Sequence, residues 1–352
     1  MKLLKSLLLS TLTAVSFSAC SNVEKQKEGI QVIDYRNPKK VCFGRIEVTV
    51  PKETEVEYSN FNYNGSDIEF DEKIKGYDDY VKLIADKIQY LKHEPHETEG
   101  VLLKQEISGT VQQAGRSISH IIVYRDGKYV TSLYEVYGYL YFPQKGLLVL
   151  KSGASNDLLD EAIDDMKNTL KSIKIRSTKG EEQAGLCWKD FFIADDMSKN
   201  IPFGGGYLHF KFPSYPGMRI DINHRVTYES DQPLIAMMKK NQQDLPEIAK
   251  IKLGVKNLRE QQKVIHGLAG EEVLNHIYER GLAERGFEDG AWQYLGTLDN
   301  HNDPFIHYSL ESAEMTNPNE SFYSNISQKN VIQLHDFILK SLQVSPNNKK
   351  EK

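Results

Sequence analysis

The sequence predicts an α+β fold made of two related units, each an antiparallel sheet with helices packed on one side. Three observations lead to this prediction. Segments rich in β-branched and aromatic residues follow one another without the strand–helix–strand alternation of doubly wound folds. Helical periodicity is confined to a few segments. The residues that open and close the first half of the chain also recur in the second half.

The chain begins with a signal-peptide pattern, MKLLKSLLLSTLTAVSFSAC. Lys2 and Lys5 provide a positive start. The apolar or small residues that follow, up to position 19, match the ~7–15 residues of a signal-peptide core, whereas a membrane-spanning helix needs ~20. The small residues before Cys20 fit a lipobox, in which the cysteine thiol receives a diacylglyceryl group. We therefore expect residues 1–19 to be a signal peptide and Cys20 to be lipidated. The alternative is an ordinary signal peptide cut elsewhere, with Cys20 incidental.

Lipidation at Cys20 would anchor the chain, because each buried methylene contributes ~0.8 kcal/mol and stable anchoring takes more than one acyl chain. Ser21 stands where an aspartate would favour inner-membrane retention. In a cell with two membranes we therefore expect an outer-membrane anchor facing the periplasm. Residues 20–40 are predicted to be a polar, lipidated tether and residues 346–352 a disordered tail. No later segment is apolar over 18 residues, so no further membrane span is expected.

Length, charge and cysteine content narrow the class of protein. The length after residue 19 predicts about two domains. Removing residues 1–19 takes the formal net charge from −5 to about −7, which argues against nucleic acid as a partner. With Cys20 lipidated, Cys42 and Cys187 remain, and two thiols in an oxidising compartment predict a disulfide. The alternative is two separate buried thiols.

Matching features mark the two predicted units, residues 41–177 and 186–345. Each unit opens with a cysteine just before an apolar, aromatic-containing strand, in VCFGRIEVTVP and LCWKDFFIADD. Each closes with an amphipathic helix, in NDLLDEAIDDMKNTLKSIKIR and SQKNVIQLHDFILKSLQV, where apolar residues recur every three or four positions. Ser327 is the predicted N-cap of the second helix, and Ser155 or Asn156 that of the first. The polar, glycine-bearing segment STKGEEQAG between the units is typical of a domain boundary.

The interior of each unit is predicted from the same signals. In the first unit, DDYVKLIADKIQYLKH is a helix, and SISHIIVYRDG, KYVTSLYEVYGYLYF and KGLLVLKS are strands. In the second, QPLIAMMKKNQQDL is a helix, and GYLHFKFP, MRIDINHRVTY, AWQYLGTL and FIHYSLESAE are strands. Several tyrosines recur along one strand, namely Tyr134, Tyr137, Tyr139 and Tyr141. One face of this strand is expected to be core. The other is either an ordinary half-buried surface or a partner surface, since tyrosine offers contact area at low entropic cost.

One segment, LKHEPHETEG, invites a metal-site interpretation through His93, Glu94, His96 and Glu97. Two histidines that share a zinc ion from one helix stand four residues apart. Here they stand three apart, and Pro95 breaks the helix between them. We therefore interpret this segment as a helix end with solvated polar residues.

Other candidate motifs lack the context that catalysis requires. Gly204, Gly205 and Gly206 lead into a strand without the Lys-Ser/Thr of a phosphate loop, which predicts a flexible turn. In GLAGEEVLNHIYERG, Glu271 and Glu272 are interpreted as an acidic helix start, rather than as an acid–base pair beside Gly270 and His276. No Gly-x-Ser-x-Gly occurs. The remaining histidines are scattered, and His307 is a candidate strand-face residue; the set is His120, His209, His224, His266, His301, His307 and His335. We expect no catalytic residue, cofactor or metal.

Several segments together resemble a known family. The chain is similar to the two-domain immunity lipoproteins that neutralise phospholipase effectors delivered by type VI secretion systems. The resemblance rests on CFGRIEVTVP after the tether, LCWKDFF at the start of the second half, FPSYPGMRIDIN, GLAGEEVL, and the closing helix ending ILKSL. It covers most of the chain after residue 40.

The resemblance implies a periplasmic, membrane-tethered inhibitor whose partner is a cognate lipase or phospholipase effector. Tight inhibition needs an interface of ~1,600 Å² or more, and two units can grip a partner from two sides. Two alternatives belong to other classes. An enzyme would show a deep pocket with convergent titratable groups. An envelope-structural or cell-wall-binding lipoprotein would capture peptidoglycan or assembly proteins instead of a lipase.

Overall fold

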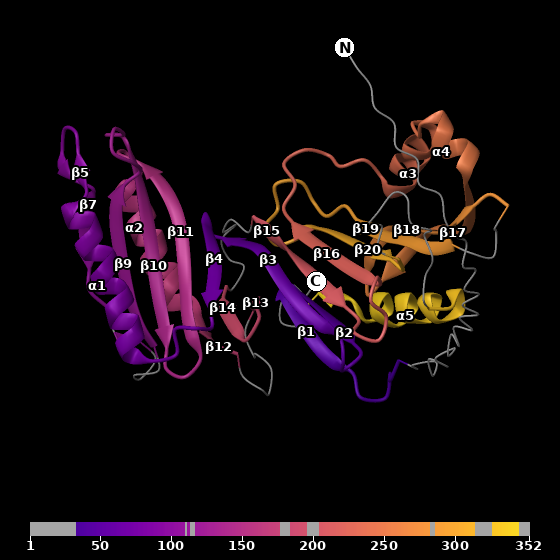
Figure 1. Ribbon diagram of the computed structural model, residues 1–352, viewed down its shortest axis with the longest axis horizontal. Helices are drawn as coiled ribbons and strands as arrows, with labels where there is room; N and C mark the ends of the chain where they lie inside the picture. The colour runs from indigo at the N-terminus through magenta and orange to yellow at the C-terminus, as the bar shows by residue number, and fades with distance from the viewer. Residues whose placement is uncertain are drawn as a thin grey trace, which may run out of the picture. The chain divides into compact units, whose positions relative to one another are not determined.

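The computed structural model describes residues 33–109, 111–112, 117–176, 184–195, 204–281, 286–313 and 326–344 (Figure 1). The predicted signal peptide, Cys20, most of the tether and the predicted tail lie outside these residues. Antiparallel strands form a 13-stranded sheet, a six-stranded sheet and a two-stranded ribbon. The predicted α+β class is confirmed. Among the described residues, no helix has both the length and the apolar character needed to cross a membrane.

The large sheet runs through most of the described chain, and β8 (Val111–Gln112) pairs with β9 beside its main path. Its other strands are, in spatial order, β17 (Leu253–Ile265), β18 (Leu268–Glu279), β19 (Gly286–Tyr294), β20 (Phe305–Glu311), β16 (Arg219–Arg225), β15 (Gly205–Lys211), β3 (Glu55–Tyr63), β4 (Ser66–Asp71), β11 (Gly146–Ser155), β10 (Leu133–Phe142), β9 (Ser117–Arg125) and β7 (Leu103–Ile107).

Of the two smaller sheets, the six-stranded one takes strands from both ends and from the middle of the chain. The six-stranded sheet has the order β12 (Ile173–Ile175), β14 (Phe191–Ala194), β13 (Gly185–Trp188), β1 (Lys39–Gly44), β2 (Ile46–Val50) and β21 (Gln343–Val344). The ribbon pairs β5 (Pro95–His96) with β6 (Gly100–Val101). The helices are α1 (Tyr77–His93), α2 (Leu159–Ser172), α3 (Leu234–Gln243), α4 (Glu247–Lys252) and α5 (Gln328–Ser341).

Both larger sheets join the two halves of the chain. In the large sheet β3 pairs with β15, and in the six-stranded sheet β1 pairs with β13 while β2 pairs with β21. The backbone hydrogen bonds of β1 and β3 are therefore completed by strands of the second half. The division into domains 41–177 and 186–345 stays a prediction, but the strand pairing across it is a feature that the sequence pattern did not indicate.

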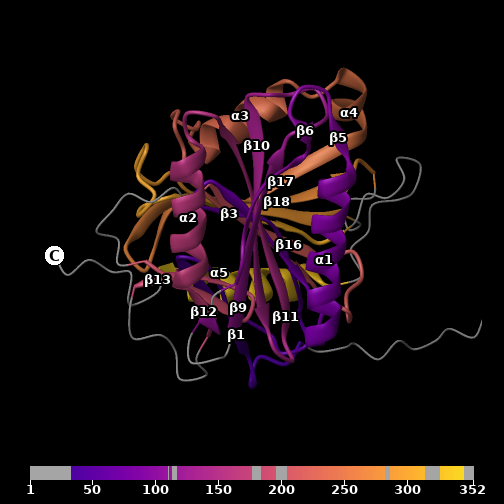
Figure 2. The same ribbon diagram turned by 90° about the vertical axis from the view of Figure 1, so that its left-hand side faces the viewer.

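Helices cover both faces of the large sheet, not one side as the sequence predicted. Alternate residues of β10 point to opposite faces. Tyr139 and Tyr141 pack against α1, whereas a Cβ at Gly138 would meet Met166 and Leu170 of α2. Figure 2 shows α1 and α2 on either side of these strands. Because β10 is apolar on both faces, both must be covered to exclude water.

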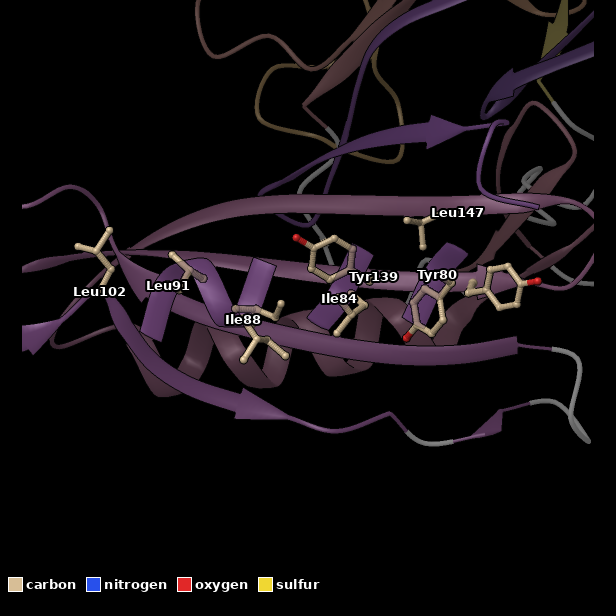
Figure 3. Packing of buried hydrophobic residues seen from close by; sticks show 9 residues of the cluster. Tyr80, Ile84, Ile88, Leu91, Leu102, Tyr139 and Leu147 are labelled. Atoms are coloured by element: carbon tan, nitrogen blue, oxygen red, sulfur yellow. The ribbon is translucent and has the colours of Figure 1, made fainter. Parts of the chain in front are cut away.

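The α1 side of the sheet holds a well-defined core (Figure 3). One side of α1 contributes four buried residues at helical spacing: Tyr80, Ile84, Ile88 and Leu91. They meet Tyr139, Tyr141, Leu147 and Ile122 from the strands, together with Leu102. The ring of Tyr80 stacks on that of Tyr141, with centroids 5.0 Å apart. Full burial of each large apolar side chain contributes ~1.5–3 kcal/mol, so this cluster ties α1 to the sheet.

Helix starts differ in how well the sequence predicts them. Ser327 caps α5 as predicted, because its side chain accepts a hydrogen bond from the backbone N–H of Asn330. For α2 the prediction of Ser155 or Asn156 is wrong. Leu158 occupies the N-cap position without a side-chain cap, and the Ser155 hydroxyl instead donates to Asp157.

Candidate functional site

The predicted disulfide between Cys42 and Cys187 is present in the structure, with Cα atoms 5.7 Å apart. It links β1 to β13, whose pairing places Gly44 opposite Cys187. Such a long-range crosslink removes conformational entropy from the unfolded chain, worth about 5 kcal/mol in the chain-entropy model. The bond therefore holds together the two strands that open the predicted units.

A cleft of about 780 Å³ opens beside this disulfide. One part of its wall is apolar and comes from four strands: Val41 on β1, Val56 on β3, Phe70 on β4 and Ile175 on β12. Lys189 and Asp190 from the β13–β14 turn also line it. The cleft thus combines residues from both halves of the chain, which makes it the leading candidate for binding a partner.

Charged side chains surround the cleft, and several pair with each other. Lys145 lies 3.2 Å from Asp190, and Lys189 lies 3.9 Å from Glu72. The Lys189 ammonium also lies 5.3 Å from the centre of the Phe70 ring. Such exposed pairs contribute ~0–1 kcal/mol each to stability. They can therefore exchange partners at little cost when another protein docks.

Tyr58 and Arg176 provide hydrogen-bond donors in the cleft. Burial raises the pKa of Tyr58 to about 12, although the Arg176 charge opposes this effect. The phenol therefore keeps its proton at neutral pH and can donate a hydrogen bond. With the apolar wall, these donors suit a segment that presents apolar side chains beside carbonyl or carboxylate oxygens.

A second constellation surrounds Glu272, a fully buried residue of β18. Its carboxylate accepts hydrogen bonds from Lys263 at 2.5 Å, Gln261 at 2.5 Å and His335 at 2.9 Å. Arg259 lies 3.3 Å from the same carboxylate. Burial alone would raise the pKa of Glu272, but the hydrogen bonds from His335, Lys263 and Gln261 outweigh burial and hold the pKa well below its usual range. Glu272 is therefore ionised at neutral pH.

Glu272, His335 and Asp336 offer ligand atoms within 4.8 Å of one another, a spacing that a metal ion could use. Two cations already occupy this space. Arg259 makes two hydrogen bonds to Asp336, at 2.5 and 2.8 Å, and Lys263 binds Glu272. The two carboxylates are thus balanced by two fixed positive charges. The arrangement fits a structural ion network rather than a metal site.

The interpretation of Glu271 and Glu272 as a helix start is wrong, because both lie in β18. This segment pairs with β17 on one side and β19 on the other, and these neighbours override the local acidic pattern. The two glutamates point to opposite faces of the sheet. Glu271 accepts a hydrogen bond from the backbone N–H of Ile235, 2.8 Å away in the first turn of α3. The Glu271 carboxylate therefore complements the start of α3, a different element from the one that contains Glu271.

His96 departs from the expected solvated helix end. His93 ends α1, as predicted, and Glu94 and Glu97 follow without a metal-binding arrangement among the described residues. His96 is buried, and its Nδ1 accepts hydrogen bonds from the backbone N–H groups of Thr98 and Glu99. The reversal of the chain after Pro95 is organised around this ring, so its role is structural.

The three glycines do not form the predicted flexible turn. Gly205 and Gly206 belong to β15, with Gly204 just before it. A Cβ at Gly206 would lie 2.7 Å from the Phe43 ring. Gly206 therefore permits β1 to pack closely against β15, a long-range reason that the sequence pattern does not reveal.

The other polar candidates are also structural. His307 lies on β20 as predicted, and burial lowers its pKa. His209 and His276 each contact one carboxylate, Asp221 at 2.7 Å and Glu288 at 3.0 Å. Of the four tyrosines, Tyr134, Tyr139 and Tyr141 are buried and Tyr137 is half-buried. This strand therefore offers little surface to a partner.

Sequence reasoning missed a buried ion pair between Arg45 and Asp195. Their side chains are 1% and 0% exposed, with Nη2 and Oδ2 2.5 Å apart. Arg45 Nε also donates to the backbone oxygen of His301, 3.1 Å away. The position of Arg45 between apolar residues in CFGRIEV is the one sequence feature that indicates its burial. A buried guanidinium requires a partner, but the sequence does not show that the partner is Asp195.

Asp289 is expected to weaken the fold at neutral pH. It faces Glu311 across the β19–β20 pairing, and burial together with this second carboxylate raises the pKa of Asp289 to about 6. Its stabilising contribution is thus complete below the unfolded pKa of ~4 and is lost as the pH rises through about 6. We expect Asp289→Asn to raise the melting temperature by roughly 2–4 °C at pH 7.5 and to have little effect at pH 4.5. Equal shifts at both pH values in thermal denaturation would contradict this assignment.

Comparison with known proteins finds one matching family model. Residues 181–347 match the family model described as the C-terminal domain of Tle cognate immunity protein 4. The second half of the chain is therefore similar to this immunity-protein domain. A comparison with curated proteins gave no match.

Solved structures with a similar fold cover 89% of the chain. The structure of a Tle4–Tli4 complex matches with a TM-score of 0.74 and 20% identity, covering 99% of that chain. The apo structure of the type VI secretion immunity protein TplEi from Pseudomonas aeruginosa matches with a TM-score of 0.72 and 18% identity, also over 99% of its length. TplEi bound to an "L" peptide gives 0.67 at 18% identity, over 100% of that chain. At these identities the likeness shows a shared fold.

Proposed function

We infer that this protein is an immunity protein that binds and inhibits a type VI secretion phospholipase effector and so protects the cell that produces it. The observation that carries this inference is the match of residues 181–347 to the Tle cognate immunity family. The shared fold with TplEi and with the immunity chain of the Tle4–Tli4 complex supports it. Inhibition then depends on a protein–protein interface and requires no catalytic residue in this chain.

The cleft beside the disulfide is our candidate for part of that interface. Both halves of the chain line it, so a segment of the effector seated there would be held from two sides. Holding that segment would keep a lid over the effector's active site from opening, or would block substrate entry. The net charge of the chain, −5, would speed association with a basic effector surface, an effect that salt weakens.

The proposed location follows from what the effector attacks. A phospholipase acts on the membrane, and an inhibitor tethered by lipid at Cys20 has a raised local concentration there. We therefore place the protein in the periplasm, anchored to the outer membrane through residues 20–40. Labelling with palmitate should mark the native chain and leave a Cys20→Ala variant unmarked; labelling of both would exclude this anchor.

The test of function is a phospholipase assay with the effector encoded beside this protein. Excess purified protein should abolish its activity, and unchanged activity would reject the inferred function. Arg176→Glu and Tyr58→Ala should each raise the Kd at least tenfold if the cleft takes part. Lys82→Glu, an exposed charge reversal on α1, is the matched control and should leave the Kd unchanged. Full inhibition by the native protein and by both cleft variants would retain the function and exclude the cleft.

A further inference from the structure

The short helix α4 and the first residues of β17 expose aliphatic side chains. No residue of α4 is buried. Ile248 is 65% exposed, Ile251 is 70% exposed, and Val255 on β17 is 40% exposed. Ile248 and Ile251 are three residues apart and share one side of the helix. Exposed isoleucines grouped in this way indicate a surface that is covered when the protein functions.

Basic residues flank these isoleucines. Lys250 and Lys252 lie beside them on α4, whereas Lys256 follows Val255 on β17 and points to the opposite face of that strand. The Arg280 side chain donates hydrogen bonds to the backbone oxygens of Lys250 and Leu253, which fixes the junction between α4 and β17. Lys250 forms an ion pair with Glu247, and both residues lie on α4. The segment is therefore locally basic in a chain whose net charge is −5.

The composition of this surface favours a membrane over a protein partner. Central protein–protein contacts are enriched in aromatic residues and arginine and are depleted in lysine. Surfaces that lie on bilayers combine aliphatic side chains, which enter the acyl boundary, with lysines that meet anionic headgroups. α4 has the second composition. We propose that Ile248, Ile251 and Val255, with Lys250 and Lys252, form a contact site for an anionic phospholipid surface.

Such a contact would act alongside a lipid anchor. A flexible tether limits distance from the bilayer but leaves orientation free. A weak second contact through α4 would restrict the orientation of the protein on the bilayer. The surface that does not touch lipid would then be presented to an approaching effector in fewer orientations. The contact is expected to be reversible and sensitive to salt, because lysine attraction to anionic lipid is screened within a Debye length.

Vesicle co-sedimentation tests this proposal. The chain from residue 20 onward, with Cys20→Ser to remove acylation, is mixed with vesicles of phosphatidylethanolamine and 30% phosphatidylglycerol, or of phosphatidylcholine alone. We expect binding to the anionic vesicles that falls at least fivefold in Ile248→Ser/Ile251→Ser and in Lys250→Gln/Lys252→Gln. The control Val264→Ser/Leu298→Ser removes aliphatic residues that are 67% and 51% exposed elsewhere and should bind like the parent chain. Thermal denaturation checks that each variant is folded.

Two outcomes would overturn the membrane contact. The first is a vesicle result: either the parent chain does not bind the anionic vesicles, or the parent and all variants bind both vesicle types equally. The other comes from inhibition measured without vesicles on a water-soluble ester. If Ile248→Ser/Ile251→Ser loses inhibition there, the surface binds the effector and not lipid. Retained inhibition in that assay with lost vesicle binding supports the proposal.

Discussion

Replacing Glu272 by alanine is expected to lower the free energy of unfolding by about 3–5 kcal/mol. The carboxylate is fully buried and accepts hydrogen bonds from Lys263, Gln261 and His335. Its removal leaves the ammonium of Lys263 without its closest counter-charge and leaves the buried imidazole without its acceptor. The cost therefore comes mainly from the groups that stay behind, above all from the fully buried imidazole of His335, which cannot regain water without opening the contact between α5 and β18.

Denaturant unfolding at pH 7 measures this effect, and the neighbouring residue provides the control. Glu271 lies on the opposite face of β18 and accepts hydrogen bonds from the start of α3 and from the exposed side chain of Gln262. Glu271→Ala should therefore cost about 1 kcal/mol. Because the pKa of Glu272 is depressed, its contribution is present above the unfolded pKa of ~4.3 and declines as the pH falls towards the folded value. Equal losses for both alanine variants would show that the ion network does not act as described.

Replacing Arg45 by methionine is expected to have an effect of similar size, about 3–5 kcal/mol. Methionine approximates the volume of the arginine stem, so the change removes charge and hydrogen bonds with little loss of packing. Asp195 would then lose its guanidinium partner while its carboxyl group stays buried. The residues belong to different halves of the chain, so the loss should appear as cooperative unfolding of both halves rather than local fraying.

A double variant separates the ion pair from its surroundings. Arg45→Met/Asp195→Asn removes both charges and should recover a large part of the lost stability, because no buried charge is left unpaired. Lys145→Met breaks the exposed pair with Asp190 and should change stability by less than about 1 kcal/mol. A double variant no more stable than Arg45→Met alone would assign the loss to packing instead of charge.

The sequence predicted those features of the fold that depend on residues close together in the chain. The helices α1, α2 and α5 follow from apolar residues at helical spacing, and Ser327 follows from the chemistry of N-caps. The Cys42–Cys187 bond follows from counting thiols. By contrast, the two glutamates of β18 suggest a helix start, but their hydrogen-bond partners lie on three other elements, α3, β17 and α5. Ile235 and His335 lie 36 and 63 residues away in sequence, and the local pattern around the glutamates does not indicate these contacts.

The cleft could not be predicted for the same reason. Tyr58, Arg176 and Lys189 carry no motif, and they line one cleft because β1 pairs with β13 and β3 pairs with β15. Arg45 and Gly206 are further examples. The burial of Arg45 depends on Asp195, and the need for glycine at 206 depends on Phe43.

By itself, the sequence determined the α+β class, the main helices and the cysteine pair, because periodicity, capping and thiol chemistry act over a few residues or through a single bond. Only the tertiary structure decided that strands of both halves share two sheets, that helices cover both faces of the large sheet, and that buried charges at Arg45 and Glu272 have partners. These features arise from hydrogen bonds and ion pairs between distant segments. The free energy of these contacts depends on which segments pack together in the folded chain. The composition of a single segment does not show which distant segment it will contact.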